Sequence, residues 1–365
     1  MKSTSILLGA MLAALPLQAQ TAQHITATKA NDYALAYSLP NTIIDVTIEA
    51  EITVKKPGEF YRYAPKYLNI NNPISAEQHS ARVLSAVISS HGVPDPDNLF
   101  NITFKSGSPV DVYLTGSGIP LAINTTETQK PAPLELPEAR KAAPTPLETP
   151  VARQVVSEEM MQSKSTAKRA ELAAQAIFAL RQTRSELISG QAETMPPDGK
   201  SLQLMLDNLQ AQEDALMAMF VGTTSTSTQV ETFQIDPELI PADSDELRVI
   251  VARVSAIDGI VSTDDLSGTP VYVDLSVINR GETPVNEKGQ QLPFPKNGVP
   301  YAIPGQLSAT VSYDGQEIAS RTINVSQLGL VYGLAPNSFT NKKAPIFVLF
   351  DPTTGAILRQ GPANR

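Results

Sequence analysis

The sequence predicts an α+β fold that is mainly β, with two β-sandwich-like modules joined by a long antiparallel helical hairpin. Two observations lead to this class. Segments on both sides of the middle of the chain alternate polar and apolar residues with a period of two, the pattern of half-buried strands. Between them, residues 157–221 consist mostly of Ala, Leu, Gln, Glu and Arg, which are good helix formers.

Residues 22–130 form the predicted N-terminal β module. Its clearest strand is 42–54, where Val46, Ile48 and Ala50 alternate with polar Thr and Glu. Pro40-Asn41 is expected to turn the chain between this strand and an earlier one at 33–39. Further elements are predicted as strands at 81–89, 99–104, 110–114 and 121–123, and as a short helix or turn at 60–68.

Residues 131–156 form a predicted linker. Six prolines lie between positions 131 and 150, and proline lacks the backbone N–H that helices and central strands need. Such a density of proline favours the extended polyproline conformation. We therefore expect an extended linker with some edge-strand character.

The predicted helical hairpin, residues 157–221, contains two stretches with apolar residues at three- and four-residue spacing. Its first helix, of roughly 30 residues, is expected to be about 45 Å long. The Met-Pro-Pro-Asp-Gly segment at 195–199 forms the turn, and Asp198 or Ser201 caps the second helix.

An antiparallel arrangement of these two helices brings Leu180 near Leu209 and Leu172 near Leu216. Apolar stripes of this kind usually form the seam between partner helices. The basic residues of the hairpin are expected to form a solvated face: Lys168, Arg169, Arg181 and Arg184.

Residues 228–365 form the predicted C-terminal β module, a sandwich or a jelly-roll-like barrel, because short strands follow one another at even spacing. Asp314-Gly315 is expected to join two of them as a tight hairpin, since Asp-Gly favours primed turns. The strands are predicted at 246–254, 271–277, 305–313, 317–325, 346–350 and 356–358.

The first 19 residues resemble a secretory signal peptide, with Lys2, an apolar run from Ile6 to Leu15 and a small-residue site ending at Ala19. The apolar run is about ten residues long, whereas a bilayer span needs about 20. The chain has no cysteine, so it has no cysteine for a lipid anchor, a disulfide or a Cys-based metal site. We expect an exported protein, periplasmic or secreted, without a membrane span.

The formal net charge is −9, and the sequence shows no basic patch with interleaved aromatic residues. An acidic chain of this kind is a poor ligand for nucleic acid. We therefore expect no nucleic-acid partner. For an exported protein, the expected partner is an unknown envelope protein or a glycan.

The best polar cluster lies in the segment 91–98, His-Gly-Val-Pro-Asp-Pro-Asp-Asn. It brings an imidazole, two carboxylates and an amide together in sequence, so His91, Asp95, Asp97 and Asn98 are candidate binding residues. Turn chemistry, in which Asp and Asn bond to the local backbone, explains the same residues without a ligand.

Three tyrosines at 60–68 are further candidates for a binding surface, with covering of one end of the β core as the alternative: Tyr61, Tyr63 and Tyr67. The three histidines do not have the spacing of metal ligands, so we predict no metal site, no cofactor and no catalytic residue.

Ser165-Thr-Ala-Lys168 matches the S-x-x-K motif of penicillin-recognising enzymes. The other two motifs of these enzymes do not fit. Lys105-Ser-Gly107 loosely resembles K-T-G, but it precedes the S-x-x-K motif whereas K-T-G should follow it. Ser244-Asp-Glu246 takes the place of S-D-N and lies in a different module. We expect a chance match.

Several segments together resemble family 4831 among the domains of unknown function, a family of exported proteins from Bacteroides-type Gram-negative bacteria. The resemblance covers nearly all of the chain after the signal peptide. It is carried by the segments 61–68, 92–97, 176–190 with 195–199, 301–305 and 350–356. It implies an exported β-rich protein and brings no assigned activity or catalytic residue.

Two hypotheses of function follow. The first is a non-catalytic envelope protein that acts as a structural or macromolecule-binding scaffold, since no catalytic constellation is visible. The second is a glycan-directed hydrolase or carbohydrate-binding module, because sandwich and jelly-roll folds often carry such sites.

Overall fold

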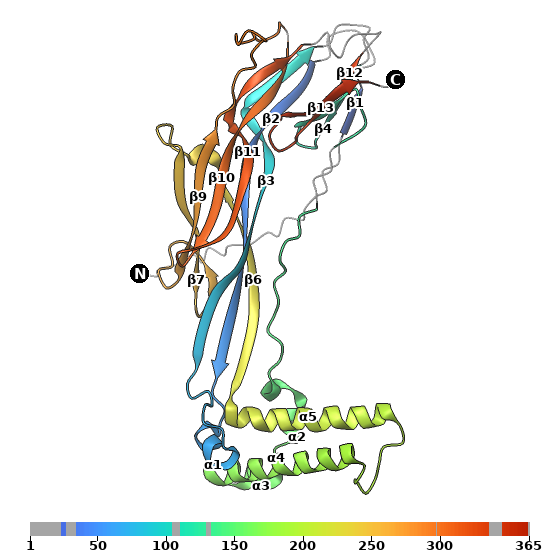
Figure 1. Ribbon diagram of the computed structural model, residues 1–365, viewed down its shortest axis with the longest axis vertical. Helices are drawn as coiled ribbons and strands as arrows, with labels where there is room; N and C mark the ends of the chain where they lie inside the picture. Colours follow the sequence, from blue (N-terminus) through green and yellow to red (C-terminus); the bar gives the residue numbers. More distant parts are fainter. Residues whose placement is uncertain are drawn as a thin grey trace, which may run out of the picture.

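The computed structural model is elongated, with β-sheets along its long axis and two long helices at one end (Figure 1). It describes residues 23–26, 34–103, 110–128, 133–296, 298–335 and 345–363. The predicted signal peptide, residues 1–19, lies outside the described residues. Strands hold 45% of the residues and helices 23%, which confirms an α+β fold that is mainly β.

The longest strands form a three-stranded sheet, which we call the stalk sheet. β2 (Ala34–Lys56) pairs antiparallel with β3 (Gln78–Thr103) on one side and with β6 (Thr223–Ile235) on the other. Val46, Ile48 and Ala50 are fully buried, as their alternation predicts. Pro40 and Asn41 lie within β2 and do not form the predicted turn, because β3 also continues past this point and pairs with both halves of β2.

A second sheet, the body sheet, has the strand order β11-β10-β9-β7-β8. Its strands are β7 (Glu246–Ser255), β8 (Gly259–Val261), β9 (Thr269–Asn279), β10 (Val299–Tyr313) and β11 (Gln316–Leu334). Asp314 and Gly315 both have positive φ and turn β10 into β11, which confirms the predicted tight hairpin. The buried faces of this sheet and of the upper stalk sheet share one apolar core, in which Ile48 and Leu275 are fully buried.

A third sheet, the apical sheet, is built from segments at both ends of the chain. Its order is β1 (Gln23–Thr26), β4 (Asp111–Leu114), β5 (Pro120–Ile123), β12 (Ile346–Phe350) and β13 (Ile357–Pro362). Strand pairing therefore crosses the predicted module boundary twice, at β2–β6 and at β5–β12. Strands from residues 22–130 and 228–365 share sheets and do not form separate ones.

Short helices lie at the base of the stalk and beside the cavity described below. These are η1 (Tyr61–Tyr63), α1 (Ala64–Leu68), η2 (Pro146–Glu148), α2 (Pro150–Gln154), α3 (Glu158–Gln162) and η3 (Pro237–Leu239). The expected helix or turn at 60–68 is therefore η1 followed by α1.

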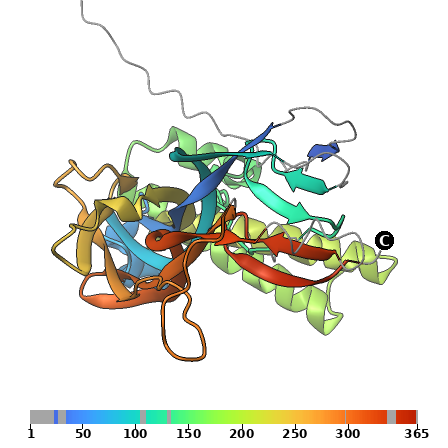
Figure 2. The ribbon, with the colours of Figure 1, turned by 90° about the horizontal axis from the view of Figure 1, so that it is seen from above.

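Two long helices, α4 (Thr166–Ser189) and α5 (Gly199–Val221), form what we call the helical arm. It extends sideways from the stalk, on the same side as the apical sheet (Figures 1 and 2). Asp198 caps α5 by accepting hydrogen bonds from the backbone N–H groups of Lys200 and Ser201. The predicted helix of roughly 30 residues is divided into α3 and α4, because Ser157 and Ser165 each cap a separate helix.

The arm packs most closely at its base, where Ile177 and Leu216 are 0% and 1% exposed. The rings of Phe60 and Phe220 pack nearby in a tilted arrangement with centroids 5.4 Å apart, which joins the arm to the stalk. Leu180 and Leu209, which the spacing places in the seam, are half-buried. None of the helices in the described part of the chain is long and apolar enough to cross a bilayer.

A buried carboxylate corrects the prediction that the basic residues of the arm form only a solvated face. Glu213 on α5 is 6% exposed, and its two oxygens bind Arg181 Nε at 2.6 Å and Arg184 Nη1 at 2.8 Å. Both arginines reach across from α4. They are thus part of the contact between the two helices.

Candidate functional site

Two irregularities in neighbouring strands open a cavity between the stalk and body sheets. In β3, pairing with β2 passes from Pro94 to Leu99, so residues 95–98 bulge opposite Leu39. In β11, pairing with β10 passes from Val325 to Leu330, so residues 326–329 bulge as well. β-Bulges of this kind are typical next to functional sites. The cavity has a volume of about 610 Å³, and its polar lining includes Asn41, Asp95, Asp97, Asn98, Glu238, Arg280 and Gln327.

Asp95 holds the β3 bulge in shape. Its side chain is buried: Oδ1 accepts a hydrogen bond from the Asp97 backbone N–H at 2.8 Å, and Oδ2 accepts one from Asn98 Nδ2 at 2.6 Å. Its own carbonyl oxygen accepts a hydrogen bond from Ser38 Oγ at 2.6 Å. Both carboxylate oxygens are therefore engaged within the loop, which is the turn chemistry expected as the alternative to ligand binding. Asp97 is exposed at the cavity.

The β11 bulge is attached to β2 through Thr42, which is fully buried. Gln327 Oε1 accepts a hydrogen bond from the Thr42 N–H at 3.0 Å, and Gln327 Nε2 donates one to the Thr42 carbonyl at 2.9 Å. Thr42 Oγ1 accepts from the Ser326 N–H at 3.1 Å and donates to the Thr353 carbonyl at 3.0 Å. Sequence reasoning missed these residues, because Thr, Ser and Gln in a strand read as ordinary solvent-facing positions.

The mouth of the cavity carries charges of both signs. Asp97 and Glu238 are exposed carboxylates, and Glu238 Oε1 accepts a hydrogen bond from Asn41 Nδ2 at 3.3 Å. Arg280 Nη2 pairs with Asp245 at 2.8 Å. This mixture of carboxylate, amide and guanidinium groups around a concave surface suits the binding of a polar ligand.

His91 does not line the cavity, although it lies on the same strand as Asp95. Its Nδ1 lies 2.5 Å from Asp45 Oδ2 on β2, and the other oxygen of Asp45 accepts a hydrogen bond from Gln234 Nε2. The hydrogen bond to Asp45 raises the pKa of His91, and partial burial opposes the rise. The predicted cluster is thus divided into a cavity group (Asp95, Asp97 and Asn98) and a separate His91–Asp45 pair.

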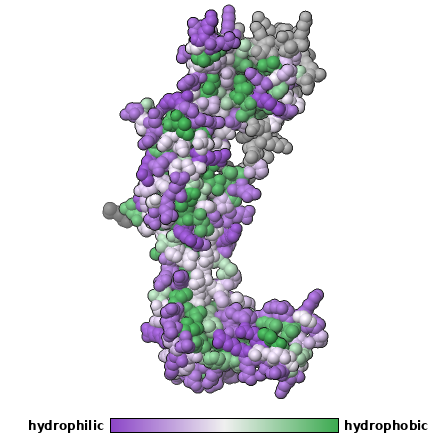
Figure 3. Space-filling view, viewed as in Figure 1, coloured by the Kyte–Doolittle hydropathy of each residue, from purple (hydrophilic) through white to green (hydrophobic). Residues whose placement is uncertain are grey.

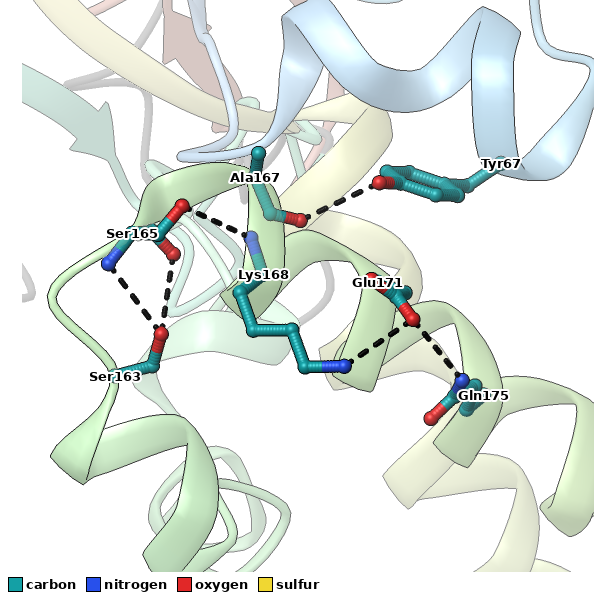
Figure 4. A network of polar contacts seen from close by, with 7 residues as sticks. All are labelled: Tyr67, Ser163, Ser165, Ala167, Lys168, Glu171 and Gln175. Carbon is teal, nitrogen blue, oxygen red and sulfur yellow. Dashed lines mark hydrogen bonds and ion pairs between the residues drawn. The ribbon is translucent and has the colours of Figure 1, made fainter.

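The three candidate tyrosines lie at the opposite end of the stalk from the cavity. Tyr63 and Tyr67 pack beside the buried cluster of the arm, with ring centroids 6.2 Å apart. Tyr67 Oη donates to the Ala167 carbonyl at 3.5 Å (Figure 4). Tyr61 lies under the guanidinium of Arg62. Tyr63 and Tyr67 therefore join the base of the stalk to the arm, and none of the three tyrosines lines the cavity.

The Ser165–Lys168 motif caps a helix. Ser165 Oγ accepts a hydrogen bond from the Lys168 backbone N–H at 3.4 Å, and Lys168 Nζ pairs with Glu171 at 3.2 Å, away from Ser165 (Figure 4). A serine nucleophile of the S-x-x-K type needs contact with a base. Its lysine instead forms an ordinary i,i+3 ion pair on the helix surface.

Among the described residues, no three His, Cys, Asp or Glu side chains come together to hold a metal ion. No curated protein and no solved structure matches the chain. A family of domains of unknown function, DUF4831, matches residues 33–358, a range that contains the stalk sheet, the body sheet, most of the apical sheet and the helical arm. The chain belongs to the DUF4831 family.

Proposed function

We propose that this protein is a non-catalytic scaffold of the bacterial cell envelope that binds another exported macromolecule. The observation that carries the proposal is the helical arm at the end of the stalk (Figure 1). It exposes large apolar side chains, whose exposed fractions are 52% for Phe178, 68% for Ile188 and 64% for Leu204. Hydrophobic and hydrophilic residues are intermixed over its surface (Figure 3). Exposed apolar side chains rimmed by polar ones are typical of surfaces that bind proteins.

The contacts of Asp95 and His91 support a binding role for the protein over acid–base chemistry by these two residues. Asp95 is engaged by two donors of its own loop, and His91 is paired with Asp45 outside the cavity. A general acid or base has to reach the proton that it transfers. The resemblance of residues 1–19 to a signal peptide supports the envelope location.

Site-specific photo-crosslinking tests the proposal. A photoreactive amino acid is placed at Ile188 or Leu204 in cells that produce the protein, and at Ile257 as the control, because this position in the turn between β7 and β8 is 67% exposed. We expect a discrete adduct of the same mass from both arm positions and none from Ile257. Equal labelling at all three positions, or none at the arm, contradicts the proposal.

The cavity supports a second candidate, a glycan-directed hydrolase or carbohydrate-binding module. Its volume of about 610 Å³ and its carboxylate and amide lining suit a sugar with several hydroxyl groups. The residues that would carry this role are Asp97 and Glu238. Binding of soluble oligosaccharides that is lost in Asp97→Asn and in Glu238→Gln, with the fold unchanged, favours this candidate over the scaffold.

A further inference from the structure

The outer edge of β6 is covered at one point by residues 133–145, which we call the strap. Arg140 and Thr228 form an isolated antiparallel bridge, in which each backbone N–H donates to the other residue's carbonyl at 3.2 and 2.8 Å. The strap runs beside the stalk as a long extended segment (Figure 1). The Thr228 hydroxyl also accepts from the Arg140 N–H at 2.9 Å and donates to the Glu138 carbonyl at 3.4 Å. No other backbone-to-backbone hydrogen bond joins the strap to β6, and the structure describes both segments throughout. The outer edge of β6 therefore pairs with an extended segment, but only at Thr228.

The geometry of the antiparallel ladder shows which backbone N–H and C=O groups of β6 face its outer edge. In an antiparallel sheet, every second residue turns its N–H and C=O to the same neighbouring strand. Thr228 bonds to the strap, so Thr224 and Thr226 turn their backbone groups to this same outer edge. Continuing the pairing from Arg140 brings Ala142 and Pro144 opposite them, and Pro144 has no N–H to donate. Pro144 thus prevents the strap from completing the ladder at Thr224.

Side-chain packing holds the strap weakly. Residues 133–144 are exposed apart from the half-buried Pro137, and even Leu134 and Leu136 are 44% and 43% exposed. Hydrophobic stabilisation scales with the apolar area removed from water, so a segment with exposed leucines gains little from its position. Displacing the strap would expose little additional apolar surface.

The edge also lacks the features that normally protect a free strand. Edge strands are usually blocked by Lys, Pro or a bulge. The lower half of β6 reads Thr-Thr-Ser-Thr-Ser-Thr, and the whole strand pairs with β2 without a break in register. A regular, uncharged edge of this kind is suited to strand addition from another chain.

We propose that the outer edge of β6 at residues 223–228 is a strand-accepting site. Its occupant is an extended, proline-free segment of a partner polypeptide that runs antiparallel to β6, and the strap is the displaceable cover. Main-chain hydrogen bonds supply the affinity, and the row of Thr and Ser favours β-branched or hydroxyl side chains opposite them. The inference rests on the macromolecule-binding role proposed above, but it uses a different surface from the helical arm.

A labelled peptide tests the site in the purified chain. The probe has the sequence of residues 134–145 with Pro137→Thr and Pro144→Thr, and its binding is measured by fluorescence anisotropy. Arg140→Pro removes the backbone N–H that donates to Thr228 and so weakens the bridge, whereas the matched control Arg140→Ala keeps this N–H and removes only the exposed side chain. We expect Arg140→Pro to bind the probe at least about tenfold more tightly than Arg140→Ala, because the cover competes with the ligand.

A second pair of variants locates the binding edge in the Arg140→Pro background. Thr226→Pro removes an N–H that points outward and spares the ladder with β2, whereas Thr226→Val keeps it. We expect at least about tenfold weaker binding with Thr226→Pro than with Thr226→Val. If Thr226→Pro does not fold, protection of the Thr224 and Thr226 amides from hydrogen exchange by the peptide gives the same information.

Equal binding by Arg140→Pro and Arg140→Ala overturns the proposal, as does binding without protection of these two amides. Concentration-dependent self-association of Arg140→Pro, measured by sedimentation velocity and insensitive to the peptide, also overturns it, since the occupant is then a second copy. Because the crosslinking experiment places its probes on the helical arm, failure of the strand-accepting site can be distinguished from failure of the scaffold role.

Discussion

Glu213→Gln is expected to destabilise the helical arm, because it removes the negative charge that pairs with both Arg181 and Arg184 across the contact between α4 and α5. Loss of one member of a fully buried ion pair costs about 3–5 kcal/mol, whereas an exposed pair contributes about 0–1 kcal/mol. Glu213 is buried, but the side chains of the two arginines are 41% and 30% exposed. In Glu213→Gln both guanidinium groups can therefore be solvated by water, and we expect the free energy of unfolding of the arm to fall by about 1–3 kcal/mol.

Hydrogen exchange followed by mass spectrometry measures this change separately for the arm and for the sheets. Asp214→Asn is the matched control, because Asp214 is the next residue and is exposed. We expect faster exchange over α4 and α5 in Glu213→Gln only. A double-mutant cycle of Glu213→Gln with Arg181→Ala should give a coupling free energy of about 0.5–3 kcal/mol. A coupling indistinguishable from zero, or equal exchange in Asp214→Asn, would refute the assignment of this ion pair as a structural contact.

Three further predictions concern the arm, the histidine pair and the cavity. Leu216→Ala should cost about 2–5 kcal/mol, because this side chain is 1% exposed, and hydrogen exchange should rise in α1 as well as in the arm, since one buried cluster joins them. The hydrogen bond to Asp45 raises the pKa of His91, so the pair stabilises the fold below about pH 6.5 and loses this effect as pH rises through the folded-state pKa. Melting temperatures measured over a series of pH values check this prediction. Asp45→Asn should abolish this dependence of stability on pH. Asp95→Ala should lower the free energy of unfolding by about 1–3 kcal/mol, because two donors of the bulge lose their acceptor, whereas Asp97→Ala should change it by less than about 0.5 kcal/mol in the same denaturant titration.

Only part of the candidate site can be predicted from the sequence. The pattern at 91–98 includes three residues that line the cavity, Asp95, Asp97 and Asn98. It cannot show that Asp95 supports the loop or that His91 pairs with Asp45, since the partner of each side chain depends on strand pairing and register. Glu238, Arg280 and Gln327 come from distant parts of the chain, and nothing in their local sequence indicates a shared cavity.

Features that depend on near neighbours in the chain can be predicted from the amino-acid sequence. Alternation in 42–54 predicts a half-buried strand, Asp314-Gly315 predicts a primed turn, and the pair of candidate caps Asp198 and Ser201 predicts the start of α5, because backbone conformation and capping act over a few residues. Only the tertiary structure decided that β2 pairs with β6 across the helical arm and that Glu213 is buried between two arginines. Such contacts join residues that are far apart in the chain or on facing helices. Their energy comes from burial and from completed backbone hydrogen bonds, which exist only once the strands and helices have come together.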